Sequence, residues 1–506
     1  MMSSGNESVM LRIFTPWPLK KVTRKYVYFK IQQTGMPFRH DDAVTPPQRP
    51  GPEQRHLDPR GARRHDRLMN GRDRILAALS FAPADRTPRD LGGMRSTGIS
   101  AFAYGDLIRA LGLPPRLPRV YDTMQMLALP DRDVLDALGC DVVPVEGAEC
   151  TNAFDEPDRW HEFDFGGRLP ALVAHPDQYA VLPDGTVTAG TPGEPATTHR
   201  QVMPPSSYVF DEPHGGQPLD LSAEPEREDL DRLADRLEAG QPSPARIDAI
   251  AAYCARARAA TDRAIMFSGL GAGLGYPGGF PAWSVLCLTD PDYVHAYHDI
   301  VTAAAVRRIE LILPRIAPYV DILMLSADDQ GLQDRTILPP RIFRDLYVPY
   351  YRRVTDAVHA SAVHGAAVRT SAVDAAAPPG VRPGVRTFLH SCGAVYDLID
   401  DFVECGFDIL NPVQWPAGGH TPAEWKARAS GAEGPGRPAG RRLALWGGGV
   451  NTQATLPLGS IDDVRTEVSR TVETLAAGGG YVFAAIHNLL AEIPGEKVVA
   501  MYDAVV

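Results

Sequence analysis

A histidine and a cysteine two positions apart, His390 and Cys392, close a short apolar run of the sequence. Side chains at i and i+2 of an extended segment point the same way, so this imidazole and thiolate could hold one ion. Zinc favours nitrogen and sulfur ligands, and a catalytic zinc site keeps one position open beside three protein ligands. His487, which follows another apolar run, is the candidate third ligand, and zinc in such a site would hold a substrate thiol as the nucleophilic thiolate. The same spacing also fits a buried cysteine beside a hydrogen-bonded histidine that binds no metal.

Two adjacent carboxylates, Asp328 and Asp329, leave a further apolar run. They could supply a general base, a metal ligand or a substrate anchor, and otherwise one of them would cap the next turn. Other polar residues that come soon after apolar runs are the candidate substrate contacts, namely Arg95, Asn411, Gln414 and Asn451. The sequence contains no G-x-S-x-G, no H-E-x-x-H and no C-x-x-C, so it offers no support for a hydrolase elbow, a zincin or a zinc finger.

Eight short apolar runs precede these polar groups, and most are separated by segments with a helical pattern. Apolar strands that alternate with helices are typical of a buried parallel sheet. Eight of them predict a (β/α)8 TIM-type barrel, in which catalytic residues lie just after the strands. A doubly wound parallel sheet is the alternative, but the chain has no dinucleotide fingerprint. The predicted strands are residues 87–93, 141–145, 264–268, 322–326, 387–390, 408–411, 443–446 and 481–486.

The predicted barrel domain covers residues 69–506 and begins with an Asn70-capped helix. A long insertion after the second strand, residues 147–263, is expected to contain a hairpin at 179–187 and a charged helix at 226–237. Residues 1–68 carry 13 Lys and Arg against 6 Asp and Glu, and they are predicted to be a disordered or poorly ordered basic extension with a short strand at 26–31.

The composition limits the kinds of partner and the cellular compartment that we expect. The 506-residue chain has a formal net charge of −11 although residues 1–68 are basic, so the barrel itself is acidic and we expect no nucleic-acid partner. Its longest apolar runs fall well short of the roughly 20 residues of a membrane helix, so we expect no membrane span. Six scattered cysteines indicate a reducing compartment, the cytoplasm. We expect a small-molecule substrate and allow for a homodimer.

In order along residues 70–506, eight segments resemble the uroporphyrinogen decarboxylase superfamily, and in particular its zinc- and corrinoid-dependent methyltransferase branch. The resemblance implies a (β/α)8 barrel, the fold that the strand count also predicts. The segments are residues 70–79, 85–93, 326–333, 339–354, 388–396, 408–414, 446–456 and 478–494.

The two activities of this superfamily differ in their motifs. The decarboxylases carry Arg-Gln-Ala-Gly-Arg near the first strand, but here the corresponding residues 94–99 keep only Arg95, which argues against a polycarboxylated porphyrinogen. The methyltransferases use His-x-Cys and a distant Cys as zinc ligands and move a methyl group between a corrinoid protein and a thiol. His390 and Cys392 match, and His487 stands in place of the distant Cys.

The resemblance thus implies a zinc-dependent methyltransferase whose corrinoid is carried by a separate partner protein. In that reading Asp328 or Asp329 orients the substrate or acts as the base. Two alternatives stay open. One is a metal-independent decarboxylase of a porphyrinogen or another carboxylate, and the other is a non-catalytic binding protein on the same barrel.

Overall fold

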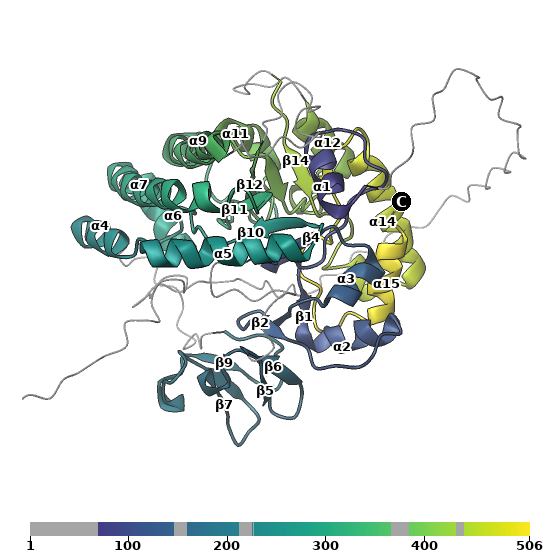
Figure 1. The fold of residues 1–506 in the computed structure, drawn as a ribbon. Coiled ribbons are helices and arrows are strands. Elements are labelled where there is room, and N and C mark those ends of the chain that lie inside the picture. Colours follow the sequence, from purple (N-terminus) through teal and green to yellow (C-terminus); the bar gives the residue numbers. More distant parts are fainter. Residues whose placement is uncertain are drawn as a thin grey trace, which may run out of the picture.

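The computed structural model describes residues 69–145, 159–211, 225, 227–365, 384–431 and 440–505. The predicted basic extension 1–68, with its strand at 26–31, lies outside the described residues, so that prediction is untested. The described part is an α/β fold built on one central parallel sheet (Figure 1).

Seven parallel strands form this sheet in the order β15-β14-β13-β12-β11-β10-β4, and the sheet curls as in a TIM-type fold (Figure 1). They coincide with seven of the eight predicted strands, because each is a largely buried and mostly apolar run of the kind that a covered parallel sheet requires. Their bounds are β4 (Val142–Val145), β10 (Ala264–Phe267), β11 (Ile322–Ser326), β12 (Arg386–His390), β13 (Ile409–Asn411), β14 (Ala444–Trp446) and β15 (Tyr481–Val482).

The first predicted strand, residues 87–93, is reduced to one isolated parallel bridge between Arg89 and Phe483. Pro88 lacks an amide hydrogen and Gly92 turns with a φ of +74°, so a longer strand cannot form. The short segment still reaches both edges of the sheet. Asp90 N donates to Phe483 O at 2.8 Å, and Asp141 N, directly before β4, donates to Arg89 O at 2.8 Å.

The interior of the curled sheet is apolar up to its carboxyl end. A cluster of buried side chains takes members from every one of the seven strands, with Phe388 of β12 and Trp446 of β14 among the largest. The ring centroids of these two residues lie 5.5 Å apart. His390 comes two residues after Phe388 and therefore lies on the same face of β12, above the apolar layer. This alternation places the imidazole at the carboxyl end of the barrel interior.

Helix α1 (Gly71–Leu79) covers the opposite, amino end of the interior. The predicted cap is present, since Asp73 N donates to Asn70 Oδ1 at 2.7 Å. Ile75 and Leu79 join the interior cluster. Helix α1 thus closes the end of the barrel that lies away from the histidine.

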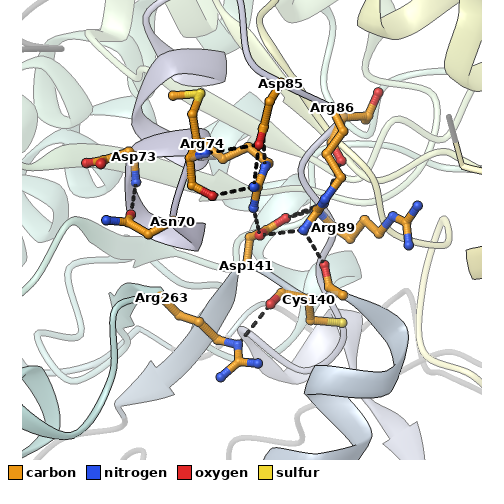
Figure 2. A network of polar contacts seen from close by, with 12 residues as sticks. Asn70, Asp73, Arg74, Asp85, Arg86, Arg89, Cys140, Asp141 and Arg263 are labelled. Carbon is orange, nitrogen blue, oxygen red and sulfur yellow. Dashed lines mark hydrogen bonds and ion pairs between the residues drawn. The ribbon is translucent and has the colours of Figure 1, made fainter. Parts of the chain in front are cut away.

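A buried aspartate before β4 ties this end together (Figure 2). The carboxylate of Asp141 accepts hydrogen bonds from Arg74, from both terminal nitrogens of Arg86 at 2.8 and 2.9 Å, and from Arg89 N at 2.9 Å. Arg74 also binds Asp85, with 2.6 Å between Nε and Oδ1. Helix α1, the segment before the sheet and β4 are therefore held by one charged network.

An aspartate directly before a strand also accepts a backbone hydrogen bond at two other strands. Asp321 precedes β11 and accepts from Ile265 N at 3.0 Å, and Asp408 precedes β13 and accepts from Thr387 N at 2.9 Å. Each aspartate thus binds a backbone amide of the neighbouring strand. Burial opposes the ionisation of Asp408, but His359 at 3.0 Å, Arg386 and the Thr387 amide hold its pKa well below the usual range.

Small antiparallel sheets lie between β4 and β10 in the chain, set to one side of the central sheet in Figure 1. The predicted hairpin is confirmed by β7 and β8. The charged helix begins later than predicted, because Asp229 caps it, and residue 226 lies outside the described part. Whether residues 147–263 form one insertion stays a prediction. The elements are β5 (His161–Asp164), β6 (Pro170–Val173), β7 (Tyr179–Val181), β8 (Val187–Ala189), β9 (Gln201–Met203) and α4 (Leu230–Ala239).

The remaining elements cover the sheet or border its carboxyl end. Of the helices in the described ranges, none combines the length and hydropathy of a bilayer-crossing segment. The five described cysteines are free thiols. The elements are β1 (Ile99–Ser100), β2 (Val120–Asp122), β3 (Leu127–Ala128), α2 (Ala101–Ala110), α3 (Arg132–Leu138), α5 (Pro244–Ala260), α6 (Phe280–Thr289), α7 (Pro291–Ile316), α8 (Pro340–Leu346), α9 (Val348–Gly365), α11 (Ile399–Cys405), α12 (Pro422–Ser430), α13 (Thr455–Leu458), α14 (Ile461–Ala476) and α15 (Gly495–Asp503).

Candidate metal centre

Three predicted ligands converge at the carboxyl end of the barrel. One donor atom from each of His390, Cys392 and His487 lies within 4.8 Å of the other two. His390 Nε2 is 3.2 Å from Cys392 Sγ, and the two imidazole centroids are 5.8 Å apart. With Zn–S near 2.3 Å and Zn–N near 2.1 Å, donors around one ion lie about 3 to 4 Å apart, so these atoms need only small movements to share an ion.

The orientation of His390 is set from the neighbouring strand. Asn411 Oδ1 lies 2.6 Å from His390 Nδ1, and Asn411 Nδ2 donates to Trp446 O at 3.0 Å. Since Oδ1 can only accept, Nδ1 carries the imidazole proton. The lone pair is then on Nε2, the nitrogen that faces Cys392.

His487 is present as the neutral imidazole. Burial, and then repulsion from His390 when that ring is protonated, lower its pKa to about 3. Within the described residues, no hydrogen bond to its ring is found, although the side chain is largely enclosed. A neutral ring with an unused lone pair is the form in which histidine binds a metal.

Cys392 is a protonated thiol in the metal-free protein. Burial, and then the charge and hydrogen bond of Asp329, raise its pKa well above the ordinary value. Asp329 Oδ1 accepts from Cys392 N at 2.7 Å and lies 3.8 Å from His390 Nε2, and burial raises the pKa of this carboxyl as well. A cation at the centre would lower the pKa of the Cys392 thiol and favour the thiolate. The donor set therefore fits a soft divalent ion such as zinc, bound with release of a proton.

The loop that carries Cys392 is held by neighbouring backbone and side-chain groups. Gly393 N donates to Gln414 Oε1 at 2.8 Å, and Gly331 N donates to Cys392 O at 3.1 Å. Gly393 has a φ of +88°, and a Cβ there would lie 2.3 Å from the carbonyl of Gly331. Only glycine allows this close approach.

The two adjacent aspartates face different surroundings. The carboxylate of Asp328 accepts from Leu274 N at 2.7 Å, Ser326 Oγ at 2.8 Å and Tyr351 OH at 2.6 Å. It thus anchors the glycine-rich loop after β10. Asp329 alone of the pair contacts candidate ligands, namely the backbone amide of Cys392 and the ring of His390.

The predicted substrate contacts lie at different distances from the centre. Arg95 is half-exposed and pairs with Asp122 at 3.2 Å. The residue after it, Ser96, was not predicted, yet its Oγ lies 3.4 Å from His390 Nε2. Its only signal in the sequence was its place beside Arg95. Asn451 Oδ1 accepts from the amides of Gln453 and Ala454, so its carbonyl oxygen is used within its own turn.

The chain resembles known proteins in sequence and in structure. A solved structure described as a methyltransferase from Methanosarcina mazei is similar at 16% sequence identity with a TM-score of 0.45, over 86% of this chain and 98% of that one. No curated protein matches significantly. The family model described as uroporphyrinogen decarboxylase (URO-D) matches residues 229–506, which is more than half of the chain and includes all three candidate ligands. The chain therefore belongs to the uroporphyrinogen decarboxylase family.

Proposed function

We propose that the protein is a zinc-dependent enzyme that transfers a methyl group to a thiol-type acceptor. The observation that carries the proposal is the convergence of two imidazoles and one thiol within 4.8 Å at the carboxyl end of the barrel. Active sites of barrels of this type lie at that end.

His390 Nε2, Cys392 Sγ and His487 would hold the ion. When bound, zinc would hold the sulfur of a thiol substrate as the thiolate in its fourth position. Asp329 Oδ1 is placed to receive the proton that the thiol gives up, because it lies 3.8 Å from His390 Nε2 in a half-buried position that raises its pKa. A carboxyl with a raised pKa is a stronger base than an ordinary aspartate.

Other groups would select the substrate and the donor. Arg95, held by Asp122, would bind an anionic group of the acceptor, and Asn451 and Gln414 would line the pocket. The methyl group would come from a corrinoid on a separate partner protein or from another methylated compound.

Metal analysis of the chain purified without chelators tests the proposal. We expect about one zinc per chain, lost in Cys392→Ala and retained in the matched control Cys254→Ala, a buried free cysteine of α5. The zinc-loaded chain should then methylate a thiol with methylcobalamin as the donor. Zinc at equal levels in both variants would overturn the ligand set.

The family match also favours a second candidate, decarboxylation of a carboxylate substrate without metal. Release of CO2 from a porphyrinogen or a smaller carboxylic acid by metal-free protein would support it. The same result would remove the need for zinc in the reaction.

A further inference from the structure

We infer that Asn411 is a positioning residue for His390 and is not the substrate contact that its place after a strand suggests. Its role is to select the tautomer of His390 and to fix the rotation of the ring. The consequence for metal binding rests on the proposed function, whereas the tautomer itself can be measured without any metal.

The register of the sheet places the two side chains together. His390 and Asn411 are paired residues of the adjacent parallel strands β12 and β13, and Ser391 N donates to Asn411 O at 2.7 Å. Both side chains are buried, with 5% of His390 and none of Asn411 exposed to solvent. A fully enclosed amide is out of the reach of a substrate.

Both polar atoms of the amide are already used. Nδ2 donates to Trp446 O at 3.0 Å, and a carbonyl oxygen cannot donate in return. The amide therefore cannot flip without losing this bond, and Oδ1 stays 2.6 Å from His390 Nδ1. Two strands, β13 and β14, thus determine which nitrogen of His390 carries the proton.

The backbone beside the amide is shaped for it. Gly447 directly follows β14 with a φ of +83°, and a Cβ there would lie 3.1 Å from Asn411 Nδ2 and 2.9 Å from Ala485 O. A larger residue would press on the amide and the adjoining backbone. The glycine leaves the space that lets Asn411 lie between His390 and Trp446.

The effect should resemble that of other hydrogen-bond partners of metal-bound histidines. Such a partner fixes the ring and raises its basicity as a ligand, and its loss costs about 10- to 100-fold in metal affinity. Leucine has nearly the shape of asparagine but no acceptor. Asn411→Leu should therefore raise the zinc dissociation constant by about 10- to 100-fold.

The first measurement is the tautomer of His390 in the metal-free full chain with 15N-labelled histidine. Long-range 1H–15N correlation spectra distinguish the two ring nitrogens, and the His390→Gln variant identifies the resonances. We expect the Nδ1–H tautomer in the wild type and in Asn411→Asp, which keeps an acceptor, and a mixture of tautomers in Asn411→Leu. The Nε2–H tautomer in the wild type would overturn the inference even if the leucine variant does not fold.

The second measurement is zinc affinity by competition with a chromogenic chelator. Gln330→Leu is the matched control, because it removes a buried amide that donates to Tyr276 OH at 2.9 Å and does not touch His390. We expect Gln330→Leu to keep the wild-type tautomer and affinity. Equal losses of affinity in both leucine variants would show a general packing effect and overturn the positioning role. If the wild type binds no zinc, the proposed metal centre fails while the tautomer result still decides the role of Asn411.

Discussion

The closest backbone approach beside the candidate metal centre gives the sharpest prediction, which concerns Gly393→Ala. The added methyl carbon would lie 2.3 Å from both the carbonyl carbon and the oxygen of Gly331, far inside van der Waals contact. Gly393 also has a φ of +88°, which side chains disfavour. The variant must therefore move the loop away from residue 331 or accept severe strain.

Two costs add in this variant. The left-handed backbone costs about 1 kcal/mol for alanine, and a methyl group forced into a packed region costs about 1–3 kcal/mol more. The expected loss in the free energy of unfolding is then about 2–4 kcal/mol. Because relief of the overlap would also break the bond from Gly331 N to Cys392 O, the thiol should shift and zinc should bind more weakly.

The free energy of unfolding of Gly393→Ala is measured by urea titration of the metal-free protein, with Gly419→Ala as the matched control. Gly419 has a φ of +76°, but a Cβ there would meet nothing within 4 Å. It carries the conformational cost alone, about 1 kcal/mol. If Gly393→Ala is no less stable than this control and binds zinc as the wild type does, the reasoning from close contact is refuted.

Three further predictions concern charges and hydroxyls. Asp408→Asn should lower the free energy of unfolding at pH 7 by about 3 kcal/mol. Because the pKa of Asp408 is depressed in the folded state, this difference from the wild type should shrink as the pH falls below about 4. A difference that stays constant from pH 7 to 3 would contradict this prediction. Tyr351→Phe should cost about 1–3 kcal/mol by removing a donor to buried Asp328, and unchanged urea midpoints would count against it. Arg95→Ala should change the free energy of unfolding by less than about 1 kcal/mol, because the ion pair of Arg95 with Asp122 is half-exposed. Weaker binding of an anionic acceptor by this variant would then indicate that Arg95 binds the substrate. A large loss of stability would instead indicate a structural role.

The sequence predicted the strands well because each strand of a covered parallel sheet is an apolar run. The first strand was the exception. Its apolar character is interrupted by Pro88 and two glycines, so only a bridge forms, although the segment joins the sheet where it was expected. Predicted strand positions were therefore more accurate than predicted strand lengths.

The roles of the site residues were less predictable where they depend on which neighbours a side chain faces. Nothing in the sequence distinguishes Asp328 from Asp329, yet one anchors a loop and the other faces the ligands. Likewise Asn411 and Gln414 follow a strand as substrate contacts would, and the sequence does not show that each also binds the segment of residues 390–393. Such roles depend on contacts between distant parts of the chain, which residue types alone do not specify.

The placement of the ligands has a consequence for the mechanics of the barrel. His390 ends β12, whereas His487 follows β15, three strands further along the sheet and beside the segment that joins its edges. A bound ion would be a cross-link between these strands, so its binding energy would oppose any opening of the sheet between β12 and β15. At a free zinc concentration of a thousand times Kd, this amounts to about 4 kcal/mol. Removal of the metal should therefore loosen the sheet between β12 and β15 first, and amide hydrogen exchange there would report how fully the centre is occupied.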